Sequence, residues 1–155
     1  MEQLARLAAA EVDCYADSSF LVSLYRNDSN RAAADKFMLR HGPLLAFSPL
    51  NRIELRNALR NACSFGQITE SEKRAAFRRI DADLAEGILS HLLITWTNVF
   101  QEADELSEKH AFREGQRTID LLHVAIARGC GAKTFLSFDT RQRRLAQAAG
   151  LKVKP

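Results

Sequence analysis

Four acidic residues stand where a chain of alternating strands and helices would place functional side chains. Asp17 and Asp139 each follow directly on a short apolar run. In α/β proteins the carboxyl ends of strands face the ligand crevice, so an acid directly after a buried strand is a candidate for chemistry. Glu54 and Asp120 fall in the first turns of segments with helical periodicity. We expect these four carboxylates to meet in one pocket.

Carboxylates that lie close together in this way need something that offsets their negative charge. They cannot all stay ionised in a small pocket unless their pKa values rise or a hard cation binds among them. Oxygen-only ligands suit Mg²⁺ or Mn²⁺, and such ions activate water and stabilise the charge on a phosphodiester that is being cut. The pattern therefore predicts a metal-dependent nuclease. We assign Asp17 and Asp120 to direct ligation, Glu54 to ligation or to orienting a metal-bound water, and Asp139 to a second ion or an outer position.

Length and composition are those of one ordinary globular domain. The chain has 155 residues, of which 46% are hydrophobic and 26% charged, so it can bury a real core. Three widely spaced cysteines argue against a disulfide framework or a zinc site and for a reducing compartment. No apolar run reaches the roughly 18 residues that a membrane span needs, so we expect a cytoplasmic protein. The net charge of +3 is compatible with a polyanionic partner and does not establish one.

Apolar periodicity and capping residues divide the chain into alternating strands and helices. The predicted strands cover residues 12–16, 44–47, 92–96, 134–138 and 151–154. The predicted helices begin near residues 18, 27, 49, 70, 98, 119 and 140, and a short leading helix is expected over residues 1–11. Strands that alternate with helices over the whole length predict a parallel sheet covered by helices on both faces.

Four motifs together resemble a known family over nearly the entire chain. They are D-S-S-F-L from Asp17, N-R-I-E-L-R-N-A-L around Glu54, T-I-D-L-L-H-V-A-I-A around Asp120, and T-F-L-S-F-D-T-R ending just after Asp139. This combination is similar to PIN-domain proteins of the VapC toxin type. The resemblance implies a single Rossmann-like α/β/α domain with endoribonuclease activity, often on tRNA or rRNA. It also implies pairing with a VapB-type antitoxin, and we expect a homodimer.

The same resemblance assigns roles to individual residues. Its acidic positions carry over as Asp17, Glu54, Asp120 and Asp139, with Ser19 and Ser137 as hydroxyls that support the acidic pocket. Such toxins usually start almost at their first strand, whereas about a dozen residues precede it here. Residues 1–11 are therefore treated as an N-terminal helical extension of one domain spanning residues 1–155.

Each acid, taken singly, also fits a purely structural role. The helix dipole alone favours Asp120 in a first turn, Asp17 and Asp139 suit turns, and Glu54 could pair with an arginine. His123, one turn after Asp120, is better interpreted as a packed and hydrogen-bonded histidine than as a base. Among alternative functions for the whole protein, the main one is a non-catalytic PIN-like module that binds RNA or a protein. A haloacid-dehalogenase-like phosphatase needs a second aspartate two residues after the first, where this chain has Ser19.

Two groups of arginines follow proposed site acids in the sequence. We hypothesise that they contact the RNA backbone, which would fix the position of the RNA without selecting its sequence. The first group recurs every fourth residue along one predicted helix, and the second opens the last predicted helix: Arg52, Arg56 and Arg60; Arg141, Arg143 and Arg144. Solvated helix faces carry similar arginines, so the sequence alone is compatible with either role.

Overall fold

A parallel sheet forms the centre of the molecule. The computed structural model describes residues 12–110 and 115–155, and within these residues the sheet has five strands in the order β3-β2-β1-β4-β5. Every neighbouring pair is parallel. The strands are β1 (Cys14–Ala16), β2 (Leu45–Phe47), β3 (Leu89–His91), β4 (Thr134–Leu136) and β5 (Lys152–Lys154). The predicted parallel α/β architecture is confirmed.

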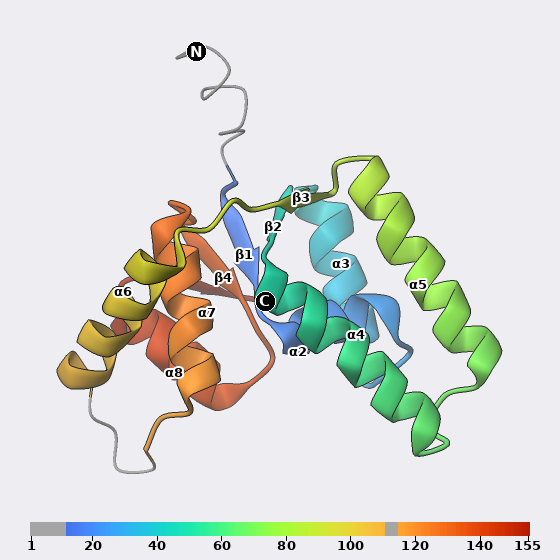
Figure 1. Ribbon diagram of the computed structural model, residues 1–155. Helices are drawn as coiled ribbons and strands as arrows, with labels where there is room; N and C mark the ends of the chain where they lie inside the picture. The colour runs from blue at the N-terminus through green and yellow to red at the C-terminus, as the bar shows by residue number, and fades with distance from the viewer. Residues whose placement is uncertain (1–11, 111–114) are drawn as a thin grey trace.

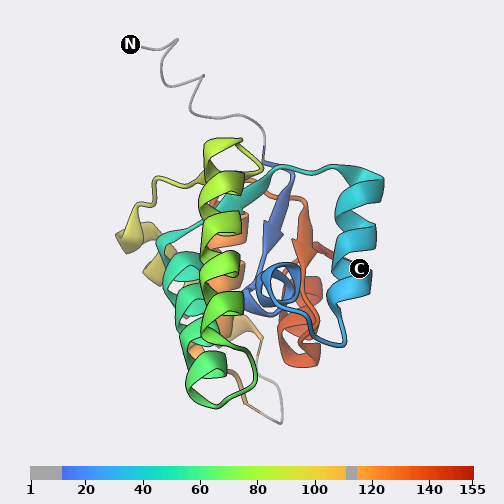
Figure 2. The same cartoon turned by 90° about the vertical axis from the view of Figure 1, so that its right-hand side faces the viewer.

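Helices cover both faces of this sheet (Figure 1). They are α2 (Ser18–Tyr25), α3 (Arg31–His41), α4 (Pro49–Ser64), α5 (Glu70–Ala85), α6 (Trp96–Lys109), α7 (Thr118–Gly129) and α8 (Thr140–Ala148). One core lies under α2 to α5 and the other under α6, α7 and α8. Figures 1 and 2 both show α4 and α5 running side by side on their face. Among the described residues, no helix is long and apolar enough to cross a membrane.

The pleat of the strands divides their side chains between the two cores. Tyr15 and Phe135 point to the α6–α8 side, while Cys14, Ala16 and Leu136 point to the α2–α5 side. Successive strand residues alternate between faces, so both faces of a central strand must be apolar when both are covered. This is why the central strands read as uninterrupted apolar runs in the sequence.

The start of α4 is tied directly to the end of β1. Ser48 and Asn51 form a capping box, in which the Ser48 hydroxyl accepts from the Asn51 backbone N–H and the Asn51 Oδ1 accepts from the Ser48 N–H, both at 3.0 Å. The Asn51 Nδ2 also donates to the Ala16 carbonyl at 2.9 Å. Asp17 follows Ala16 and caps α2, and Glu54 lies one turn after Asn51 on α4. This contact therefore fixes the position of α4 relative to the start of α2.

One predicted strand is wrong in position. The sequence predicted a strand over residues 92–96, whereas β3 covers Leu89–His91 and α6 already begins at Trp96. The register pairs His91 with Phe47, after which β2 gives way to α4, so residues beyond Leu92 have no strand to pair with. Leu93 is 97% exposed. The predicted helix over residues 1–11 lies outside the described residues.

The capping box generates a stability prediction. Asn51→Ala removes the reciprocal cap and leaves the buried Ala16 carbonyl without its donor, so it should lower the free energy of unfolding by about 2–3 kcal/mol. Asn57→Ala, an exposed position on the same helix, should change it by less than about 0.5 kcal/mol. Urea unfolding of both variants measures this, and equal effects would show that the capping box does not hold α4 in place.

Candidate functional site

Asp17 is a buried carboxylate at the carboxyl end of β1. Its Oδ1 accepts from the Ser19 hydroxyl at 2.6 Å and from the Phe20 N–H at 3.1 Å, so it is also the N-cap of α2. Its Oδ2 accepts from the Ser137 hydroxyl at 2.5 Å. Burial raises the pKa of Asp17 above its usual value, although the Ser137 and Ser19 hydroxyls act against that shift. Ser19 and Ser137, predicted to support the acidic pocket, therefore both contact Asp17.

Ser137 and Ser19 also connect Asp17 to the end of β4. Their two hydroxyl oxygens lie 3.3 Å apart, and the Ser19 hydroxyl accepts from the Phe138 N–H at 2.9 Å. The Ser137 hydroxyl accepts in turn from the Asp139 N–H at 3.0 Å. The two hydroxyls thus bond to the carboxylate of Asp17 and to the backbone of Asp139, at the ends of adjacent strands.

Glu54 lies at the inner edge of α4 and contacts a buried histidine. Its Oε1 accepts from the Ser18 hydroxyl at 2.6 Å and pairs with the His123 Nε2. The other ring nitrogen of His123 lies 2.7 Å from the Tyr15 hydroxyl, so a chain of hydrogen bonds runs from β1 through α7 to α4. Burial raises the pKa of Glu54, but the hydrogen bond and charge of His123 outweigh it and leave the pKa below its usual value. As predicted, His123 is buried and hydrogen-bonded.

Asp120 and Asp139 share one guanidinium. Arg117 lies at the N-cap of α7, and its Nε and Nη2 donate to the two oxygens of Asp120 at 2.8 and 3.1 Å. Its Nη2 also donates to the Asp139 Oδ2 at 3.0 Å. Asp139 caps α8 through the Gln142 N–H, at 3.0 Å. Burial raises the pKa of Asp139, but this cap and Arg117 together bring it below its usual value.

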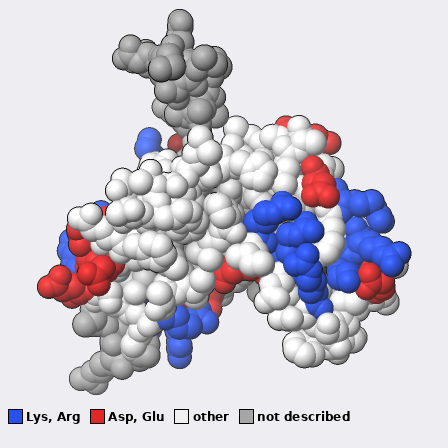
Figure 3. All heavy atoms as spheres, viewed as in Figure 1, with Lys and Arg blue, Asp and Glu red and all other residues white. Residues whose placement is uncertain are grey.

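Electrostatic effects join the two halves of the site. Besides the burial that raises the pKa values of Asp17 and Glu54, the charge of His123 lowers the pKa of Asp17 and the charge of Arg117 lowers that of Glu54. All four predicted acids therefore belong to one network with two cationic or potentially cationic groups. Figure 3 shows acidic side chains in the hollow between the α4–α5 side and the α6–α8 side of the molecule.

The donor set fits a hard divalent cation by its chemistry. It consists of carboxylate and hydroxyl oxygens, which Mg²⁺ and Mn²⁺ prefer, and Arg117 shows that a positive charge is stabilised between Asp120 and Asp139. In the described part of the chain, no three His, Cys, Asp or Glu side chains are grouped as ligands of one ion. Arg117 donates to both oxygens of Asp120, so the guanidinium and a bound ion would share the same carboxylate.

The predicted basic residues are placed in different ways. Arg56 packs its guanidinium 4.5 Å from the Phe77 ring centre, and Arg143 donates to the Ser137 carbonyl at 2.7 Å. Arg52 and Arg141 have exposed side chains and no ion pair with any residue that the structure describes. Lys and Arg side chains gather over α4 and α5 in Figure 3. Arg52 and Arg141 are thus exposed side chains that a ligand could reach.

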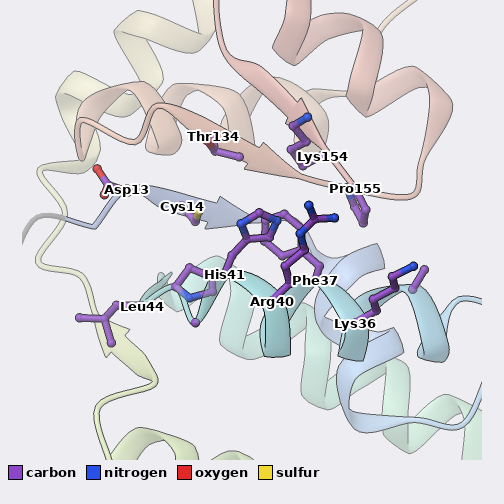
Figure 4. Close-up of a pocket in the computed structure, with 13 residues that line it drawn as sticks. Asp13, Cys14, Lys36, Phe37, Arg40, His41, Leu44, Thr134, Lys154 and Pro155 are labelled. Carbon is purple, nitrogen blue, oxygen red and sulfur yellow. The ribbon is translucent and has the colours of Figure 1, made fainter.

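A separate hollow lies away from the acids. It is a cavity of about 770 Å³ between α3 and the strands, where Lys36, Arg40 and Lys154 lie along its walls and Asp13 and Cys14 at one end (Figure 4). None of the four predicted acids lines it. The acidic cluster is therefore distinct from this cavity.

Sequence reasoning missed three residues of the site. Arg117 stands three residues before Asp120, a helical spacing at which opposite charges meet, so its pairing with that acid could have been found. Its reach to Asp139 depends on how α7 and α8 approach each other. Tyr15 lies within the strand predicted over residues 12–16, and Asn51 within the helix predicted to begin near residue 49. Their hydrogen bonds join segments far apart in the chain, which spacing alone does not show.

The fold and the acidic cluster together define a small α/β domain with a carboxylate-lined site at the carboxyl edge of its sheet. The model of the PIN domain family matches residues 14–148. The chain therefore belongs to the PIN-domain family. No curated protein sequence matches it significantly.

Solved structures share this fold at low sequence identity. VapC20 of Mycobacterium tuberculosis, described as a sarcin–ricin loop cleaving toxin, is 22% identical with a TM-score of 0.67, over 92% of this chain and 99% of that one. PAE2754 from Pyrobaculum aerophilum is 20% identical with a TM-score of 0.62, over 94% and 91% of the two chains. FitAcB from Neisseria gonorrhoeae is 16% identical with a TM-score of 0.60, over 92% and 96%. At these identities the likeness shows a common fold.

The burial of Asp17 generates a prediction about stability and pH. Its pKa is raised in the folded state, so its ionisation destabilises the fold above that pKa, and the cost vanishes below the unfolded-state pKa of about 3.9. In EDTA at pH 7.5, Asp17→Asn should therefore raise the midpoint of thermal unfolding. The expected rise is about 2–4 °C for each kcal/mol that the substitution adds to the free energy of unfolding.

The pH dependence supplies the check on that prediction. The gain should shrink as the pH falls toward 4, and the exposed Asp13→Asn should show neither the gain nor the trend. Thermal unfolding followed by circular dichroism between pH 4 and 7.5 measures both. A lower midpoint for Asp17→Asn at pH 7.5 would mean that the carboxylate's hydrogen bonds outweigh its desolvation.

Proposed function

We propose that this PIN domain is a metal-dependent endoribonuclease and the toxin of a VapBC-type toxin–antitoxin pair. It would cleave RNA phosphodiesters in the cytoplasm, act as a homodimer and be neutralised by a VapB-type antitoxin. The observation that carries the proposal is the meeting of Asp17, Glu54, Asp120 and Asp139 in one charge network, at the edge of a PIN-domain sheet.

Two further points support an RNA substrate. A structural neighbour with the same fold, VapC20, is described as cleaving the sarcin–ricin loop, which makes rRNA a natural substrate to test beside tRNA. Two exposed arginines also lie close to the acids in the sequence, Arg52 two residues before Glu54 on α4 and Arg141 two residues after Asp139 at the start of α8. A carboxylate-rich site needs such groups nearby because RNA is itself an anion.

The proposed mechanism divides the work among the chain's own residues. Asp17, Glu54, Asp120 and Asp139 would hold Mg²⁺ or Mn²⁺, which when bound supplies activation of water and stabilisation of charge on the phosphodiester. Ser19 and Ser137 fix the Asp17 carboxylate through both of its oxygens. His123, held by the Tyr15 hydroxyl, fixes Glu54. Ligands held in advance reduce the reorganisation that the reaction would otherwise require.

The cleavage assay that tests this function uses metal and acid dependence together. Purified protein with Mg²⁺ or Mn²⁺ should convert total bacterial RNA into discrete fragments, and EDTA should abolish them. Asp17→Asn with Asp120→Asn should lower the cleavage rate by at least about 100-fold, because both carboxylates are proposed ligands. Asp104→Asn, at an exposed position on α6, is the matched control and should cleave normally.

Two outcomes would separate the nuclease from a non-catalytic binding module. If antitoxin-free protein binds RNA and Mn²⁺ but gives the same RNA pattern as the double variant, the nuclease proposal is wrong and the binding module takes its place. If cleavage persists in EDTA and in the double variant, the acids are not the site.

The arginine placement predicts how RNA binding depends on salt. In an Asp17→Asn background that prevents cleavage, adding Arg52→Gln and Arg141→Gln should reduce the slope of log affinity against log salt. Each lost phosphate contact removes about 0.7 from that slope for single-stranded RNA. Fluorescence anisotropy with a labelled single-stranded RNA measures it. Arg31→Gln, whose side chain pairs with Asp35 on α3, is the control, and an unchanged slope in the test variant would place the RNA elsewhere.

A further inference from the structure

Arg117 contacts two of the four acids, and the helices that carry them are joined without it. Its guanidinium forms three hydrogen bonds, two to Asp120 and one to Asp139. The approach of α8 to α7 is secured without it, because the buried Gln142 side chain donates to the Asp120 carbonyl at 3.0 Å and the two helices share one core. The Arg117 side chain itself is 49% exposed. It can leave the acids for solvent without opening the core.

The oxygens that Arg117 engages are those that a metal ion would need. Asp120 has only two carboxylate oxygens, and both accept from the guanidinium. An arginine guanidinium stays charged in proteins, so Arg117 compensates two carboxylates, as a bound cation would.

We propose that Arg117 is an internal competitor for the metal site, so that divalent-ion binding requires its displacement from Asp120 and Asp139. The proposal rests on the proposed function, because it takes these acids to be metal ligands. Two cations that compete for the same carboxylates are coupled, and the coupling works in both directions. Arg117 weakens the binding of the ion, and the ion releases Arg117 to the exposed rim of the site. Arg117 is then a positioning residue that sets the ion concentration at which the site fills.

Metal binding by the full chain tests this directly. Isothermal titration of Mn²⁺ into metal-stripped protein should give a dissociation constant roughly tenfold lower for Arg117→Gln than for the wild type, within the usual range of coupling between linked sites. Arg117→Lys keeps the charge but lacks the planar fork that spans two carboxylates, so its affinity should lie between the two. Arg128→Gln, which removes an ion pair with Glu102 near the other end of α7, should bind as the wild type does.

Thermal unfolding supplies a second readout that does not depend on activity. Without divalent ions, Arg117→Gln should unfold at a lower temperature than the wild type, because Asp120 and Asp139 lose their shared cation. Saturating Mn²⁺ should then raise the midpoint of the variant by more than it raises that of the wild type. This larger shift shows at the same time that the variant is folded and that it binds the ion.

The outcomes distinguish this proposal from the function on which it rests. If all four proteins bind Mn²⁺ with equal affinity, the metal site stands and the role of Arg117 is wrong. If Arg117→Gln binds more weakly, Arg117 supports the site and does not compete for it, which also overturns the proposal. If none of the proteins binds Mn²⁺, both the proposed metal site and the competition fail.

Discussion

The cost of burying carboxylates at one edge of the sheet is the constraint on which the site depends. Placing Asp17, Glu54, Asp120 and Asp139 at one edge of the sheet is costly unless positive charge or hydrogen-bond donors offset them. Two kinds of group offset the four negative charges. His123 and Arg117 pair with Glu54, Asp120 and Asp139, whereas Asp17 has only neutral donors in direct contact and its pKa rises with burial. Of these four acids, Asp17 is thus the one without a cationic group in direct contact.

The fold makes this concentration of charge possible by spreading its support over many elements. Hydroxyls from α2 and from the end of β4 hold Asp17, a tyrosine of β1 and a histidine of α7 hold Glu54, and the capping box of α4 is bonded to the end of β1. Most of these supporting side chains are buried, including Tyr15, Asn51, His123 and Ser137. A rigid scaffold of this kind can hold side chains in positions that are unfavourable for stability but needed for function.

The sequence was informative about the acids because their signals are local. A strand followed by an aspartate, or a capped helix with an acid in its first turns, can be recognised within about ten residues, and all four predicted acids lie in one network. The strand predicted at residues 92–96 failed because the length of β3 is set by β2, whose pairing ends where Ser48 begins α4. The contact of Arg117 with Asp139 and the link from Tyr15 through His123 depend on tertiary approach, which no local pattern encodes.

The most direct test of the account is the position of a bound ion. Crystals of the protein grown or soaked with Mn²⁺ would show it by anomalous diffraction. The account predicts a peak among the carboxylates of Asp17, Glu54 and Asp120, with the Arg117 guanidinium no longer on Asp120. A fully occupied peak elsewhere, with Arg117 still bonded to Asp120 and Asp139, would contradict it.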